Sequence, residues 1–167
     1  MIETCIGLGS NLGDSRALLK SALAELAALP DSRLVAVSSF YRSAPMVAPG
    51  ESPDSQPDYL NAVARLDTAL APHALLDALQ AIETAHGRRR DGRRWAPRTL
   101  DLDLLLYGDQ QLDDARLRVP HPGMAERNFV LYPLAEIAPA ALVIPGAGRL
   151  AGLLEQSSMR GLEKIDT

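Results

Sequence analysis

The spacing of apolar residues divides much of the chain into short strands and two amphipathic helices. Four segments, rich in β-branched, aromatic or leucine side chains, are predicted to be strands: residues 2–8, 34–43, 59–68 and 100–107. Residues 14–29 and 72–87 instead repeat apolar positions every three or four residues, which predicts helices. Pro72 suits the first turn of the second helix, and Gly87 suits its C-terminal cap.

The order of these elements, β-α-β-β-α-β, predicts an α+β fold. It is the order of the ferredoxin-like arrangement, an antiparallel sheet with helices on one face. Residues 44–57 hold four prolines and show no periodicity, so we expect a long loop there. Beyond Gly108 the pattern is less regular, with helices expected near 129–137 and 150–158. We therefore expect one domain over residues 1–167, flanked by helices and extended by an additional C-terminal segment.

Three glycines in and after the first strand do not form a known nucleotide-binding signature. Gly7, Gly9 and Gly13 give G-x-G-x-x-x-G, one residue away from the dinucleotide fingerprint, and the chain has no P-loop sequence. We interpret Ser10 and Asn11 as turn and capping residues of the first helix. Neither a Rossmann domain nor a P-loop enzyme is predicted.

Composition narrows the function classes further. The net charge of −4 argues against a general nucleic-acid binder, and no run of eighteen apolar residues predicts a transmembrane helix. Cys5 is the only cysteine and lies in an apolar strand, so we expect it in the core of a protein from a reducing compartment. The three histidines show no zinc-ligand spacing. We expect a cytoplasmic monomer without membrane or nucleic-acid partners.

Two carboxylates interrupt the last of the four strands. Asp101 and Asp103 alternate with leucines, so they share one face of the strand, roughly 6–7 Å apart at the backbone. At that separation their charges repel by about 2–3 kcal/mol at an effective dielectric of about 20, and a cation between them reverses the sign. Two carboxylates suit Mg²⁺, which takes its remaining ligands from water and substrate phosphates.

A run of arginines precedes the acids directly. Six of the seventeen basic residues lie between Arg88 and Arg98, three residues before Asp101. Guanidinium forks beside a metal are typical of a site for a polyphosphate. Two simpler interpretations remain open, because the acids could be solvated on an outward strand face and the arginines could be solvated or bind RNA. An RNA-binding module, however, would need stacking aromatic residues on the central strands, and residues 2–8 have none.

The segment RWAPRTLDLDLL, residues 94–105, is similar to the signature of a known enzyme family. Other segments similar to that family are GLGSNLGD, SSFYRSAP, QPDYLNAV and VPHPGMAERNFVLYPLAEIAP. Together they resemble the 6-hydroxymethyl-7,8-dihydropterin pyrophosphokinase family of folate biosynthesis. The resemblance implies transfer of the β,γ-diphosphate of ATP to the hydroxymethyl oxygen of the pterin, with release of AMP. A different Mg²⁺-dependent nucleotidyl or phosphoryl transferase on the same scaffold is the alternative.

The resemblance also implies roles for individual residues. Asp101 and Asp103 would hold two Mg²⁺ ions, Arg88 would act in the chemical step, and Arg98 would contact the ATP phosphates. Residues implied at the nucleotide and its phosphates are Gln80, Glu83, Trp95, Arg98, Arg116, His121 and Arg127. Residues implied at the pterin are Ser43, Tyr59, Asn61, Trp95 and Phe129. Tyr59 and Phe129 match stacking rings and Asn61 an edge-reading amide, and Tyr59 and Asn61 share a strand face.

Overall fold

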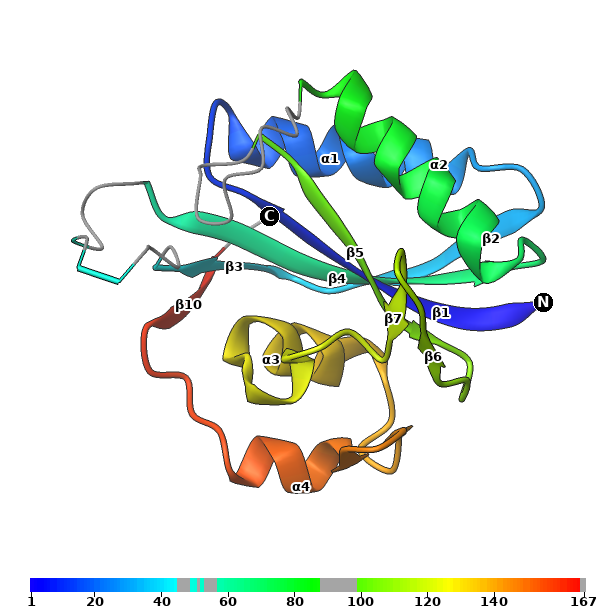
Figure 1. Cartoon of the computed structure of the whole chain (residues 1–167). Coiled ribbons are helices and arrows are strands. Elements are labelled where there is room, and N and C mark those ends of the chain that lie inside the picture. The colour runs from blue at the N-terminus through cyan, green and yellow to red at the C-terminus, as the bar shows by residue number, and fades with distance from the viewer. Residues whose placement is uncertain (45–48, 51, 53–56, 88–98, 166–167) are drawn as a thin grey trace.

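The protein is built on a six-stranded antiparallel sheet with helices on both faces (Figure 1). The structure is a computed structural model, and it describes all residues except 45–48, 51, 53–56, 88–98 and 166–167. The N-terminal elements are β1 (Ile2–Ser10), α1 (Ser15–Ala27), β2 (Ser32–Val37), β3 (Phe40–Ser43), β4 (Tyr59–Thr68), α2 (Pro72–Ala85) and β5 (Asp101–Tyr107). This order confirms the predicted α+β class, but it has one strand more than the predicted β-α-β-β-α-β succession, because three strands lie between α1 and α2.

The sheet runs in the order β10-β3-β4-β1-β5, where β10 is the C-terminal strand Leu162–Ile165, and β2 also pairs with β4. Strand β1 lies between β4 and β5, so the two longest strands form the centre of the sheet and β5 forms one edge. One side of β4 pairs with β3 near its start and with β2 near its end. The edge strand β5, which carries the acid pair, is thus held directly against β1.

The region beyond Gly108 adds short strands and helices, and one of these strands, β10, pairs with β3 in the main sheet. They are β6 (Leu112–Asp113), β7 (Arg118–Val119), the 3-10 turn η2 (Met124–Glu126), α3 (Asn128–Ile137), β8 (Val143–Ile144), β9 (Gly148–Arg149), α4 (Leu150–Glu155) and β10 (Leu162–Ile165). The two expected helices are confirmed as α3 and α4. Within the described residues, no helix combines the length and the apolar character needed to span a bilayer.

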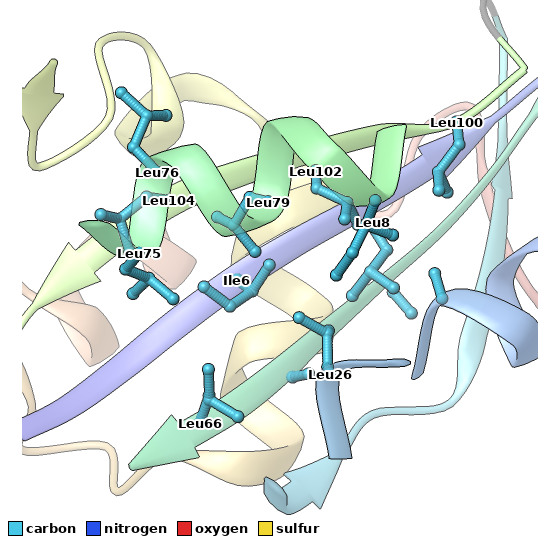
Figure 2. Close-up of a cluster of buried hydrophobic side chains, with 14 of the residues drawn as sticks. Ile6, Leu8, Leu26, Leu66, Leu75, Leu76, Leu79, Leu100, Leu102 and Leu104 are labelled. Atoms are coloured by element: carbon cyan, nitrogen blue, oxygen red, sulfur yellow. The ribbon is translucent and has the colours of Figure 1, made fainter. Parts of the chain in front are cut away.

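One face of the sheet packs against α1 and α2 through a core of aliphatic side chains (Figure 2). Strands β1 and β5 contribute Ile6, Leu8, Leu102 and Leu104, and the helices contribute leucines such as Leu79. Each Å² of apolar surface that these side chains bury stabilises the folded state by roughly 25 cal/mol. This burial is the main stabilising contribution in such a fold. The helix periodicity read from the sequence corresponds to this core.

The opposite face packs against α3 and α4 through a second, smaller core. Val63 of β4 and Leu105 and Leu106 of β5 belong to this core together with Leu131 and Leu134 of α3. A register shift between Cys5 and Ile6 in the β1–β5 pairing lets both consecutive leucines of β5 belong to this core. Figure 1 shows α3 and α4 on the side of the sheet away from α1 and α2.

The predicted strand over residues 34–43 is wrong as a continuous element, because it is two strands. Ser38 and Ser39 separate β2 from β3. The Ser38 hydroxyl accepts a hydrogen bond from the Val63 N–H at 2.9 Å, and the Ser38 N–H donates to the Val63 carbonyl at 2.9 Å. The Ser38 hydroxyl therefore takes the place of a backbone acceptor in the hydrogen bonding along β4.

The interpretation of Ser10 and Asn11 as caps of the first helix is also wrong. Asp14 caps α1, because its carboxylate accepts a hydrogen bond from the Ala17 N–H at 3.1 Å. Pro72 begins α2 as predicted. Gly87 follows the end of α2 with a φ of +85°, which a residue with a side chain adopts only at a cost, so its predicted capping place is confirmed.

Candidate active site

The acid pair lies on the α3 side of the sheet at the edge strand. Leu102 and Leu104 are buried in the core on the α1–α2 side, whereas Asp101 and Asp103 alternate with them and are partly exposed. The Asp103 side chain is 42% exposed. The predicted separation of a packed face from an acidic face is present in the structure.

Two glycines keep the sheet bare beside the acids. Gly9 of β1 pairs with Asp101 on one side and with Asn61 of β4 on the other, and Gly7 pairs with Asp103. Paired residues of antiparallel strands share a face, so no β1 side chain stands between the carboxylates and Asn61. A Cβ placed at Gly9 would lie 3.5 Å from the Asn61 Oδ1 atom. The glycines thus leave β1 without side chains on this face, and the side chains of Leu105 and Asn61 lie close to them.

Three of the residues implied at the pterin gather beyond these glycines. The Asn61 side-chain amide donates hydrogen bonds to the Ser43 hydroxyl at 2.7 Å and to the Tyr41 carbonyl at 3.4 Å. Tyr59 pairs with Ser43 across β4 and β3. Asn61 is 5% exposed, so its orientation is fixed by buried partners. An oriented amide beside an aromatic ring can bind a flat heterocycle with an amide-like edge.

The fourth such residue, Phe129, lies in the first turn of α3. It packs partly buried against the second core, and the Arg127 guanidinium lies over its ring, 5.8 Å from the centroid. This distance is within the range of a cation–π contact. Arg127 is the N-cap residue of α3, and the contact with the ring places its cation over Phe129.

His121 connects the acidic strand to the segment that precedes α3. Its backbone N–H donates to the Leu105 carbonyl at 2.9 Å, and the Nε2 atom of its ring lies 3.9 Å from the Asp103 Oδ1 atom. Its Nδ1 atom is buried, with no hydrogen-bond partner in the part of the chain that the structure describes. A buried ring nitrogen of this kind needs a polar partner, which a ligand or water could supply.

Gln80 and Arg116 meet at the outer side of α2. The Arg116 guanidinium donates to Asp77 at 2.5 Å and lies 3.5 Å from the Gln80 Oε1 atom. Asp114 shapes the turn that carries Arg116 by accepting the N–H groups of Arg116 and Leu117, each at 2.9 Å. These two backbone hydrogen bonds hold the pKa of Asp114 below its usual value. The turn thus places the Arg116 guanidinium beside α2.

Glu83 has a structural contact that sequence reasoning did not anticipate. Its side chain is buried, and its carboxylate accepts a hydrogen bond from the Leu102 N–H of β5 at 2.8 Å. The predicted nucleotide role of Glu83 stays a prediction. Its demonstrated contact holds α2 against the strand between the two acids.

The residues implied on the arginine-rich segment lie outside the described part of the chain. They are Arg88, Trp95 and Arg98. Most of the predicted loop 44–57 lies outside it as well. The roles of these residues stay predictions.

The metal role of the acid pair stays a prediction. Asp101 and Asp103 offer carboxylate oxygens on one face of β5, the kind of ligand that a hard divalent cation takes. Among the residues that the structure describes, no group of three or more histidine, cysteine or acidic side chains is arranged to hold a metal. A Mg²⁺ ion at this place would therefore depend on water or substrate oxygens for its other ligands.

A family model described as 7,8-dihydro-6-hydroxymethylpterin-pyrophosphokinase matches residues 5–139. The chain belongs to this pyrophosphokinase family. It is 51% identical over 160 residues to the 2-amino-4-hydroxy-6-hydroxymethyldihydropteridine pyrophosphokinase of Pseudomonas aeruginosa, covering 96% of this chain and 94% of that protein. The protein of the same name from Haemophilus influenzae is 45% identical over 166 residues, covering 99% of each chain.

Solved structures support the fold of this pyrophosphokinase family member. A crystal structure of HPPK-DHPS in complex with substrates has a TM-score of 0.74 at 10% identity, covering 98% of this chain and 46% of that one. A Plasmodium falciparum HPPK-DHPS structure with pterin and p-hydrobenzoate has a TM-score of 0.71 at 11% identity, covering 98% and 48%. The chain spans slightly under half the length of these larger proteins. At such identities the likeness shows the fold alone.

Two features of this pyrophosphokinase family member escaped prediction. Asn11 is 2% exposed, and its amide donates to the Pro57 carbonyl at 3.2 Å, two residues before Tyr59. Gly7 and Gly9 form the bare surface of β1. Glycines at i and i+2 of a strand were a readable signal for that surface, whereas the partner of Asn11 lies 46 residues away and had no local signal.

Proposed function

We propose that the protein transfers the diphosphate of ATP to the hydroxymethyl group of 6-hydroxymethyl-7,8-dihydropterin and releases AMP, as a step of folate biosynthesis. The observation that carries the proposal is the arrangement on one sheet face. The acid pair of β5 lies across the bare glycines of β1 from the hydrogen-bonded Asn61 of β4. Membership of the pyrophosphokinase family supports the same reaction.

The pterin would bind at the Asn61 end of this surface. The Asn61 amide is oriented by Ser43 and the Tyr41 carbonyl, which leaves its Oδ1 atom available to accept from the heterocycle edge. Tyr59 and Phe129 would stack on the ring, and Trp95 would close over it. Preformed orientation lowers the entropy cost of ordering the site when the substrate arrives.

ATP would bind at the acidic end, between β5 and the cationic residues around it. Asp101 and Asp103 would hold Mg²⁺, with two ions expected, and bound Mg²⁺ would neutralise phosphate charge. His121, Arg127 and Arg116 would contact phosphates, with Gln80 and Glu83 beside the nucleotide. Arg98 would bind phosphate in the ground state, whereas Arg88 would stabilise charge that develops during transfer.

Positioning would supply most of the rate enhancement. Attack by the hydroxymethyl oxygen on the β-phosphorus needs the two substrates in line and their charges neutralised, and no covalent intermediate is required. The sheet would provide this by holding the pterin-side residues of β4 and the acids of β5 on two strands that both pair with β1. We also propose that the chain acts as a single domain and a monomer in the cytoplasm.

The products of the reaction test the proposal. Purified protein is mixed with ATP, Mg²⁺ and 6-hydroxymethyl-7,8-dihydropterin, and the nucleotide products are separated by chromatography. We expect AMP and a pterin diphosphate in equal amounts, with none formed when Mg²⁺ is replaced by a chelator. Release of ADP would indicate a simple kinase on the same scaffold, and binding of RNA without turnover would indicate an RNA module. Either outcome would contradict the proposal.

A further inference from the structure

A glutamate of α3 connects that helix to the strands that carry the pterin-side residues. The Glu136 carboxylate accepts a hydrogen bond from the Ser39 N–H at 2.8 Å and another from the Tyr41 hydroxyl. The Lys164 ammonium of β10 lies 3.9 Å from the same carboxylate. The Glu136 side chain is 26% exposed, and Tyr41 is 4% exposed. One side chain thus joins α3 to the start of β3 and to β10.

The contact holds a carboxylate in its ionised form. Burial raises the pKa of Glu136, but hydrogen bonds from Tyr41 and Ser39 and the charge of Lys164 outweigh burial, so the pKa lies below its usual value. Burial, the hydrogen bond to Glu136 and its negative charge all raise the pKa of Tyr41. A neutral phenol donating to an ionised carboxylate is a charge-assisted hydrogen bond, the stronger kind.

Glu136 and Phe129 belong to the same side of α3. They are seven residues apart, which is close to two helical turns, so their side chains point in similar directions. On the strand side, Tyr41 pairs with Asn61, and Ser43 pairs with Tyr59. The Tyr41–Glu136 contact therefore links the helix that carries one stacking ring to the strand that orients the other ring and the amide.

We propose that Glu136 is a positioning residue for the pterin site, acting through Tyr41 and Ser39 to set the gap between α3 and β3. The inference rests on the proposed function, because it takes Phe129, Tyr59 and Asn61 as the pterin-binding group. A change in that gap alters the spacing of Phe129 relative to Tyr59 and leaves the acids of β5 in place. Pterin affinity should depend on Glu136, and ATP affinity should not.

The decisive measurement compares two affinities in matched variants. Calorimetric titration gives the Kd for 6-hydroxymethyl-7,8-dihydropterin alone and, separately, for ATP with Mg²⁺. We expect Glu136→Gln to weaken pterin binding about tenfold, since it replaces a charge-assisted hydrogen bond with a neutral one. Its ATP affinity should stay within about twofold of that of the wild type. Tyr41→Phe removes only the hydroxyl and should show the same selective loss.

Two further variants separate positioning from general effects. Glu163→Gln makes the same charge change at an exposed glutamate of β10, whose ion pair with Arg42 measures 3.6 Å, and it should change neither affinity. The double variant of Tyr41→Phe and Glu136→Gln should bind pterin no more weakly than whichever single variant binds it less tightly, because both changes act on the same Tyr41–Glu136 hydrogen bond.

Other outcomes would overturn the inference. Folded Glu136→Gln and Tyr41→Phe with normal pterin affinity and only lowered melting temperatures would show a purely structural contact. Equal losses of pterin and ATP affinity would show a general disturbance of the site. Wild-type protein that binds the pterin but releases no AMP would contradict the proposed function alone, since the pterin Kd of the variants still decides the role of Glu136. Wild-type protein that does not bind the pterin would overturn both.

Discussion

The two faces of the central sheet are made by the same strands and differ most at the end of β5 that carries the acids. On the α1–α2 side, β1 and β5 present Ile6, Leu8 and Leu104 to a leucine-rich core. On the α3 side, the same two strands present Gly7 and Gly9 opposite Asp103 and Asp101. Side chains alternate along a strand, so each residue can be selected for one face without disturbing the other. Along β5, residues that stabilise the core therefore alternate with residues that are expected to act in the reaction.

Substitution of the acid pair should give the largest effect, a loss of activity without a loss of stability. Asp101→Ala or Asp103→Ala should reduce diphosphate transfer below detection, because each removes a carboxylate expected to hold Mg²⁺. Without Mg²⁺ the melting temperature should be unchanged or slightly higher, since the repulsion between the two charges is relieved. Calorimetric melting and the AMP assay check both expectations. A large loss of stability would show instead that the acids are structural.

A leucine adjacent to the acids should give the reverse pattern. Leu104→Ala, one position beyond Asp103 and on the opposite face, should lower the free energy of unfolding by about 2–5 kcal/mol through a cavity in the core. At a temperature where the variant is folded, its AMP release should be close to that of the wild type. Chemical denaturation and the same assay measure the two effects. Loss of activity in the folded variant would mean that the two faces are not independent.

The proposed stacking residues should separate pterin binding from ATP binding within the α3 face. Tyr59→Ala and Phe129→Ala should weaken pterin binding much more than ATP binding, since aromatic faces are expected to hold the pterin ring. Titration with each ligand measures the difference. Phe40→Ala is a useful contrast, because Phe40 lies on β3 but belongs to the α1–α2 core and should mainly lose stability. Equal losses for both ligands would remove the stacking role of Tyr59 and Phe129.

The smallest effect concerns Cys5, whose side chain packs against the second core. Burial raises the pKa of this thiol to about 12, and the nearby Arg65 cation opposes the rise. A raised pKa favours the neutral thiol in the folded state, so this contribution to stability is full below the unfolded pKa and fades as the pH rises toward about 12. At about pH 8 a disulfide reagent should react slowly with the native protein and quickly with denatured protein. Equal rates would contradict the burial.

The sequence predicted the elements with a strong period and missed contacts between distant residues. Helix α2 and strand β4 were predicted because their apolar residues repeat over ten or more positions. The break at Ser38 was missed, since its hydroxyl bonds to Val63, which lies 25 residues away. The acid pair was readable because Asp101 and Asp103 are two residues apart on one strand. Glu136 and Tyr41 gave no such signal, because they meet only in the folded chain.

The hydrogen bond from the Leu102 N–H to Glu83 has a consequence for how the protein behaves in a crowded solution. Strand β5 is the last strand at its end of the sheet order, and an edge strand offers unpaired backbone groups to other chains. Here the buried Glu83 carboxylate of α2 already accepts a hydrogen bond from the Leu102 N–H, which lies between the two acids. A foreign strand that approached this edge would have to displace that carboxylate and leave its charge without the hydrogen bond, so the strand that carries Asp101 and Asp103 is protected from edge-to-edge association.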